Sequence, residues 1–208
     1  MSLRLAAALA LILGAAALLA FARQLGQGPF ASLEASHLRE MKERVDPPAH
    51  VTPITFADRA ALPHGRPVGE YSAYERRGVA LEGTVQHLLR ANDGDLHLEI
   101  VARPLLPTDW DTTYVTAEIT PRVRSSAPHW TYENLVQVFR PRLGGVTPWP
   151  QGTRRVRVTG WLLYDWQYDA PWSGPRKAGD RLTGWEIHPV TRIEAWDERT
   201  AQFAEVPR

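Results

Sequence analysis

The clearest structural signal in the sequence is Asn92-Asp93-Gly94-Asp95-Leu96-His97-Leu98-Glu99-Ile100-Val101. Its Asp-Gly pair readily adopts the positive φ angles of a tight hairpin turn. After the turn, apolar and polar residues alternate strictly, which predicts a half-buried strand with one face toward a core. The stretch therefore predicts a hairpin turn and the strand that follows it.

The same alternation continues on both sides of this hairpin. Residues 79–90 alternate before the turn and form the first predicted strand, and residues 114–119 form the third. Thr131 is a good N-cap residue, and apolar residues follow it at helical spacing. The sequence therefore predicts three strands and then a helix over residues 131–140.

Two further strands complete the predicted domain. Residues 154–164 alternate again, and residues 184–196 supply the last strand, which Pro189 bends or places at an edge. Three strands, one helix and two strands is the order of the OB-fold, a small Greek-key barrel. The predicted fold class is thus mainly β, a five-stranded OB-like barrel with one helix between strands three and four, preceded by an N-terminal hydrophobic helix.

Four segments resemble exported or membrane-anchored bacterial OB-like domains. They are Asp93–Ile100, Ala117–Ile119, Val158–Gly160 and Trp185–Val190. The resemblance implies an OB barrel on an exported protein and implies no activity. Many single-OB envelope proteins lack the acidic and histidine residues found here, so their roles are not carried over.

The N-terminus predicts transfer across a membrane. Arg4 precedes an uncharged apolar stretch, residues 5–22, which has the length of a minimal membrane span. The same stretch ends in Ala20-Phe21-Ala22, which fits a signal-peptidase site. Residues 1–23 are therefore a signal peptide or a transmembrane anchor. The first reading gives a periplasmic or secreted protein cleaved after Ala22, and the second an inner-membrane protein facing the periplasm.

The rest of the chain divides by composition. Residues 24–76 are expected to hold an amphipathic helix near 31–45 and then a Pro-rich extended connector. Residues 77–197 form the predicted barrel, and residues 198–208 a C-terminal tail.

Charge and motifs exclude several functions. The chain has 24 Lys and Arg against 23 Asp and Glu, a formal charge of +1, so strong non-specific DNA binding is not expected. There is no cysteine, which excludes disulfides and thiolate metal sites. The sequence also lacks a P-loop, a dinucleotide glycine motif, a serine elbow and a zinc-protease helix.

Polar side chains from three strands are expected to share one outer face of the barrel. They are His97, Glu99, Glu118, Glu186 and His188, with Asp95 at the adjoining turn. One interpretation is a divalent metal site, with His97, Glu118 and His188 as ligands and Glu99 or Glu186 as a base. The other, which we favour, is that these residues pair across strands and serve structure alone.

The loop between strands four and five carries aromatic and basic residues. Trp166, Tyr168, Trp172 and Arg176 are candidate ligand-binding residues, because bases and sugars stack on such rings. Glu99 and Glu118 complete the candidate binding set. The alternative is that the rings are buried against the barrel end.

Strand four presents Arg155 and Arg157 on one face. Such a pair can bind phosphate. We expect instead that they pair with Glu82 on strand one.

These patterns favour binding over catalysis. The main hypothesis is a non-catalytic cell-envelope OB-like module, without a cofactor, that binds an envelope protein, an oligosaccharide or single-stranded nucleic acid. One alternative is a metal-dependent hydrolase, plausibly a nuclease, that uses the His and carboxylate cluster with one divalent metal ion. Another is a purely structural envelope component.

Overall fold

The computed structural model describes residues 13–18, 32–144, 146, 148–150, 152–168 and 179–208. Two compact units divide the chain, Met1–Arg44 and Val45–Arg208.

In the first unit, residues 13–18 are helical and α2 spans Leu33–Lys42. The helix α2 begins at Ser32, whose side chain accepts a hydrogen bond from the Ala35 N–H. No helix within the described residues is long and apolar enough to cross a membrane. Most of the predicted signal or anchor segment, residues 5–22, lies outside the described residues.

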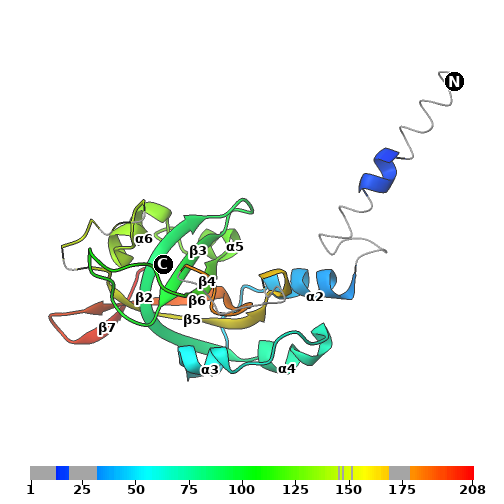
Figure 1. The fold of residues 1–208 in the computed structure, drawn as a ribbon, viewed down its shortest axis with the longest axis horizontal. Coiled ribbons are helices and arrows are strands. Elements are labelled where there is room, and N and C mark those ends of the chain that lie inside the picture. Colours follow the sequence, from blue (N-terminus) through cyan, green and yellow to red (C-terminus); the bar gives the residue numbers. More distant parts are fainter. Residues whose placement is uncertain (1–12, 19–31, 145, 147, 151, 169–178) are drawn as a thin grey trace, which may run out of the picture. The chain divides into compact units, whose positions relative to one another are not determined.

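The second unit contains a closed five-stranded barrel (Figure 1). Its strands are β2 (Gly78–Arg90), β3 (Leu96–Val101), β4 (Val115–Ile119), β5 (Arg155–Tyr164) and β6 (Trp185–Asp197). The strands β2, β3 and β4 form an antiparallel meander. The strand β4 then runs parallel to β6, and β5 pairs antiparallel with both β6 and β2, which closes the barrel. This order confirms the predicted OB-like barrel.

Apolar and polar residues alternate along β3, and this pattern turns its apolar face toward the barrel core. Leu96, Leu98 and Ile100 are almost fully buried in the barrel core. Gly94 has a φ of 92°, which an L side chain rarely adopts, and it forms the predicted turn before the strand. Residues 92–101 therefore adopt the structure that their sequence predicts.

The predicted helix is α6, which spans Tyr132–Phe139. It begins at Thr131, whose side chain accepts a hydrogen bond from the Asn134 N–H. It ends at Arg140, which has a left-handed φ of 52°. The buried side chains of Leu135 and Phe139 join the barrel core.

A β-bulge interrupts the pairing of β5 with β6. The register shifts between the pairs Gly160–Val190 and Leu162–Ile187, an interval that contains His188 and Pro189. Bulges bend a strand and redirect a side chain. Pro189 therefore lies within a bulge of a paired strand, rather than at an edge.

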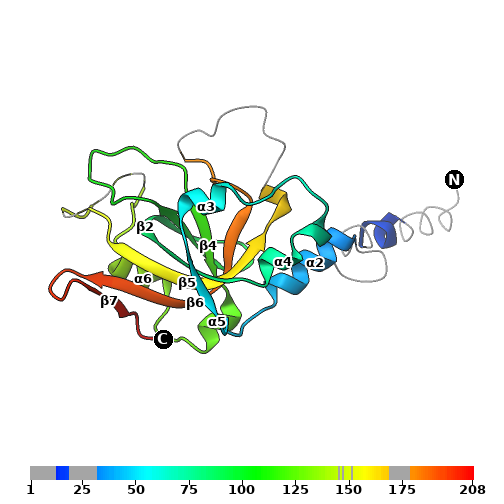
Figure 2. The same ribbon diagram turned by 90° about the horizontal axis from the view of Figure 1, so that it is seen from below.

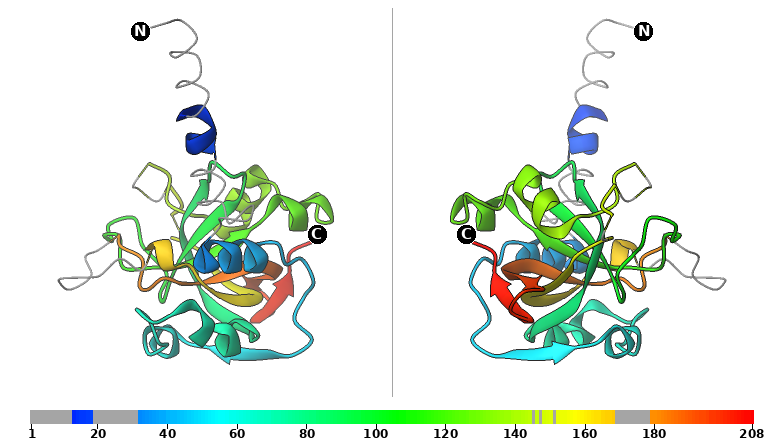
Figure 3. Two further views of the ribbon diagram at one scale, coloured as in Figure 1. Left: turned by 90° about the vertical axis from the view of Figure 1, so that its right-hand side faces the viewer. Right: turned by 90° about the vertical axis from the view of Figure 1, so that its left-hand side faces the viewer.

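The structure differs from the expected connector before the barrel. Residues 51–75 hold β1 (Val51–Ile54), α3 (Phe56–Ala60), η1 (Val68–Glu70) and α4 (Ser72–Glu75), instead of an extended arm. The strand β1 runs parallel to β2. The helix α3 has a capping box between Thr55 and Asp58, which stabilises a short helix in a Pro-rich segment. Figure 3 shows β1, α3 and α4 together on the side of the unit opposite α6.

Three short elements complete the unit. They are α5 (Pro121–Ser125), η2 (Trp166–Tyr168) and β7 (Gln202–Glu205). The strand β7 pairs antiparallel with β6, which lies between β7 and β5 (Figure 2), and the following Val206 is buried. The expected C-terminal tail is therefore partly an added strand.

Candidate functional site

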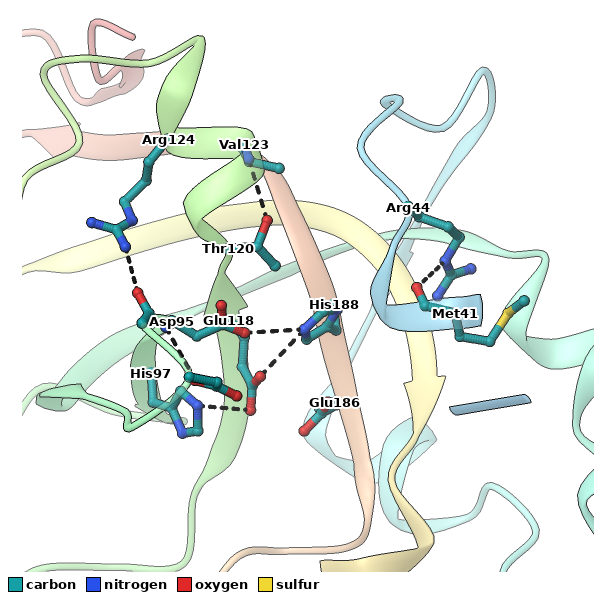
Figure 4. Close-up of polar contacts among 12 residues, drawn as sticks. Met41, Arg44, Asp95, His97, Glu118, Thr120, Val123, Arg124, Glu186 and His188 are labelled. Atoms are coloured by element: carbon teal, nitrogen blue, oxygen red, sulfur yellow. Dashed lines mark hydrogen bonds and ion pairs between the residues drawn. The ribbon is translucent and has the colours of Figure 1, made fainter. Parts of the chain in front are cut away.

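A cluster of polar side chains joins β3, β4 and β6 (Figure 4). The Nε2 atom of His188 lies 3.3 Å from Asp95 Oδ2 and 3.4 Å from Glu118 Oε2. On the other side of Glu118, Oε1 lies 3.3 Å from His97 Nε2. The strand pairing brings together the histidines and Glu118, with Asp95 from the adjoining turn, as the sequence predicts.

The cluster is buried, whereas its residues were expected on an outward-facing surface. Glu118 and His188 are each 1% exposed, and Glu186 is 0% exposed. Burying a charged group is costly unless it is paired. The expected exposure of this face was wrong. Residues from outside these strands supply positive charges, which allow the carboxylates to be buried.

Arg181 supplies one of these charges from the loop before β6. Its Nη1 lies 3.1 Å from Glu186 Oε2, and its Nη2 lies 3.8 Å from Glu118 Oε1. Burial lowers the pKa of Arg181, but the charges of Glu186 and Glu118 outweigh burial, so the pKa is raised overall. Arg181 is therefore fixed as a cation against two buried acids.

Arg59, on α3, supplies the second charge. It is fully buried, and its three guanidinium nitrogens have no hydrogen-bond partner within the described part of the chain. Burial lowers the pKa of Arg59 to about 9, while the charge of Glu186 opposes that change. Arg59 thus remains charged at neutral pH and adds positive potential near Glu186.

A hollow of about 390 Å³ lies over β3 and β4 beside this cluster. It is lined by Leu89, His97, Glu99, Tyr114, Thr116, Tyr168, Gly179, Asp180 and Arg181. The volume falls within the usual range for small-ligand sites. His97 belongs to both the buried cluster and the wall of the hollow.

Glu99 and Tyr114 interact on the wall of the hollow. Burial raises the pKa of Glu99, although the charge of His87 and a hydrogen bond from Tyr114 oppose it. Burial also raises the pKa of Tyr114, and the charge of Glu99 adds to that effect. The Tyr114 hydroxyl therefore stays protonated and donates to Glu99.

The loop aromatics that the structure describes are exposed. Trp166 is 41% and Tyr168 46% exposed, so the alternative that these two rings are buried is wrong. The ring centroid of Tyr168 lies 3.7 Å from the guanidinium carbon of Arg181. Trp172 and Arg176 lie outside the described residues.

A larger groove, of about 830 Å³, lies elsewhere in the unit between β1 and the strands β5 and β6. Its charged rim includes Glu82, which accepts hydrogen bonds from both Arg155 and Arg157. The expected pairing of these arginines is confirmed. The charges of Glu82 and Arg157 in this groove are therefore paired with each other.

Sequence reasoning missed the residues that cover the polar cluster. Arg181 is one of several basic residues in the loop before the last strand, and the sequence around Arg59 and Tyr114 contains no signal of a site. Their positions depend on how a loop and a short helix pack against the barrel. Periodicity along a strand contains no information about such packing.

Strand order and barrel closure define the chain as an OB-like β-barrel protein. No protein-family model matches the sequence, and no curated protein matches it.

Among solved structures, the chain is similar to asparaginyl-tRNA synthetase from Entamoeba histolytica, with 16% identity and a TM-score of 0.36. The alignment covers 70% of this chain and 24% of that one. Aspartyl-tRNA synthetase from the same organism matches at 16% identity and a TM-score of 0.31, over 69% of this chain and 22% of that one. The chain spans about a quarter of the length of these enzymes, and likeness this weak carries no argument about function.

Proposed function

We propose that this chain is a non-catalytic binding module that takes its ligand in the hollow over β3 and β4. The observation that carries the proposal is the position of the hollow. OB-folds bind oligonucleotides and oligosaccharides on the face of their second and third strands, with loops that include the one between strands four and five. Tyr168, from that loop, lines the hollow together with His97 and Glu99.

Contacts with neighbouring residues hold the side chains that line the hollow in position. Arg181 holds the ring of Tyr168 from one side and is itself fixed by Glu186 and Glu118. A ring that is already positioned loses less conformational entropy when a ligand stacks on it. Tyr168 is therefore the main stacking residue of the proposed site.

The charge of the lining favours a neutral, hydroxyl-rich ligand such as an oligosaccharide. Glu99 and Asp180 place carboxyl groups on the wall, and the cation Arg181 is occupied by buried acids. A polyphosphate chain needs cations to neutralise it. Sugar hydroxyls can instead donate to carboxylates and stack on a tyrosine ring.

The proposal also places the module in the cell envelope. Its support is the sequence of residues 1–23, with a basic start, an apolar middle and a small-residue ending. N-terminal sequencing of the protein recovered from fractionated cells tests this part, since cleavage after Ala22 and retention of Met1 give different first residues.

Isothermal titration of the full-length chain with cell-wall oligosaccharides and with a single-stranded oligonucleotide tests the proposed ligand class. We expect saturable binding of an oligosaccharide and none of the oligonucleotide at physiological salt. The variant Tyr168→Ala should weaken binding by about 5- to 150-fold, as expected for a lost stacking contact of about 1–3 kcal/mol.

The variant Tyr132→Ala is the matched control. Tyr132 lies on α6, and Arg90 stands over its ring at 4.4 Å, which reproduces the tyrosine and arginine pair away from the hollow. It should bind as the unchanged chain does. Equal losses in both variants, or preferential binding of the oligonucleotide, would contradict the proposal.

A further inference from the structure

We infer that Asp95, Glu118 and His188 form a buried structural zinc site beneath the hollow. The three residues come from the start of β3, from β4 and from the bulge in β6. One ligand atom from each lies within 4.8 Å of the others. This inference is independent of the ligand that the hollow takes.

The distances among these atoms carry the argument. In tetrahedral zinc sites the metal lies about 2.0–2.1 Å from nitrogen and oxygen ligands, so neighbouring ligand atoms are about 3.3–3.4 Å apart. His188 Nε2 lies 3.3 Å from Asp95 Oδ2 and 3.4 Å from Glu118 Oε2. Charge-assisted hydrogen bonds between nitrogen and oxygen are shorter, at about 2.7–2.9 Å. His87 and Asp111, outside the cluster, also lie 3.3 Å apart. The feature that suits a shared cation is therefore the convergence of one histidine and two carboxylates at these separations.

The charge of the cluster also calls for a cation. Asp95, Glu118 and Glu186 are three buried carboxylates. Among the described residues of the cluster, only the two guanidinium groups of Arg59 and Arg181 are permanently cationic. With neutral histidines the cluster is anionic, and a neutral histidine is the form that binds a metal.

The surroundings of Glu118 would orient it as a ligand. Its Oε1 atom lies 3.3 Å from His97 Nε2 and 3.8 Å from Arg181 Nη2, which leaves Oε2 to face His188. Groups that hold the second oxygen of a metal-binding carboxylate in this way tune metal affinity. His97 is therefore a positioning residue, whereas the sequence predicted it as a ligand.

Burial makes the site structural rather than hydrolytic. Asp95, Glu118 and His188 are between 1% and 6% exposed. Three protein ligands leave one of the four positions of a tetrahedral zinc ion unfilled, and burial closes that position to substrate. A zinc ion here would tie the turn before β3 to the bulge in β6.

Elemental analysis of the full-length chain, purified without a chelator, tests the inference together with thermal unfolding. We expect one zinc ion per chain, and a Tm that falls after chelation and recovers when Zn²⁺ is added back. The isosteric variant Asp95→Asn should lower zinc affinity by at least about tenfold.

His87→Ala is the matched control, because His87 lies 3.3 Å from Asp111 in a second histidine and carboxylate pair outside the cluster. It should keep its zinc. Because Glu118→Gln is expected to unfold the chain, tetrahedral d–d bands from Co²⁺ added to the unchanged, metal-stripped chain give a second readout without substitution. A chain that retains no zinc, shows no such bands and has a Tm insensitive to both Zn²⁺ and chelator would overturn the inference.

Discussion

Arg181 and Glu186 form an ion pair, with 3.1 Å between Nη1 and Oε2, at a place where the Glu186 side chain is fully buried. The pair joins the covering loop to the first residues of β6. It therefore couples the wall of the hollow to the strand that closes the barrel.

Removing Arg181 should strongly destabilise the unit. The Arg181→Ala variant leaves Glu186 and Glu118 buried without this cation, which typically costs about 3–5 kcal/mol. Urea unfolding measures the loss. In the control Arg90→Ala, an exposed ion pair with Glu133 is lost at a cost of about 0–1 kcal/mol. Similar losses of unfolding free energy in both variants would mean that the buried ion pair stabilises the unit no more than an exposed one does.

Gly160 should not tolerate a side chain. A Cβ atom there would collide with the carbonyl oxygen of Pro189 in the neighbouring strand. Gly160→Ala should therefore lower the free energy of unfolding by about 2 kcal/mol or more, as misfitting core substitutions do. Gly69→Ala, where no atom lies within 4 Å, is the control and should leave stability nearly unchanged. Thermal unfolding of the two variants compares them directly.

Glu82 should contribute stability that depends on pH. Burial raises its pKa, but hydrogen bonds from Arg157 and Arg155 outweigh burial, so the pKa is lowered overall. A carboxyl whose pKa is lower in the folded state stabilises the fold above its unfolded pKa, and loses that contribution as the pH falls through the folded pKa.

The variant Glu82→Gln should thus unfold at a lower temperature than the unchanged chain at pH 7, and the two Tm values should converge in acid. Because Glu82 is 39% exposed, solvent screening limits the difference to less than about 1 kcal/mol. Added salt should narrow it further. A difference between the two Tm values that grows as the pH falls would contradict the prediction.

Residues 45–76 should be required for folding of the barrel. Ile54, Leu62 and Tyr71 are buried in the common core, and the Trp185 indole donates to the Pro63 carbonyl oxygen at 2.8 Å. Burying three such side chains contributes about 5–9 kcal/mol, which is comparable with the whole stability of a small domain.

A chain that begins at residue 77 should therefore lack a cooperative unfolding transition, while one that begins at residue 45 should retain it. Circular dichroism during thermal unfolding distinguishes the two. Cooperative unfolding of the chain that begins at residue 77 would show that residues 45–76 are not required for folding of the barrel.

The barrel was predictable from the sequence because each strand carries its own periodic signal. The alternation from Asp95 to Val101 identifies this stretch as a strand without any knowledge of the residues that it contacts in the fold. The segment with β1 and α3 lacks such a signal, since its helices are short and its prolines resemble those of a linker. The cap between Thr55 and Asp58 is the only local sign that was available.

The site was predictable in part, for a related reason. Once the OB-fold order is known, strand adjacency places His97, Glu118 and His188 together. Their burial depends on Arg181 and Arg59, whose positions are set by loop and helix packing. A sequence pattern can thus indicate which strand residues meet, but not which distant side chains cover them.

The parallel pairing of β4 with β6, through Ala117 and Ile187, has a consequence for biosynthesis. The two partners are far apart in the chain. Contacts between such distant positions form slowly, because a long loop must close first. During translation the meander can form early, but the barrel remains open along this seam until β6 has left the ribosome.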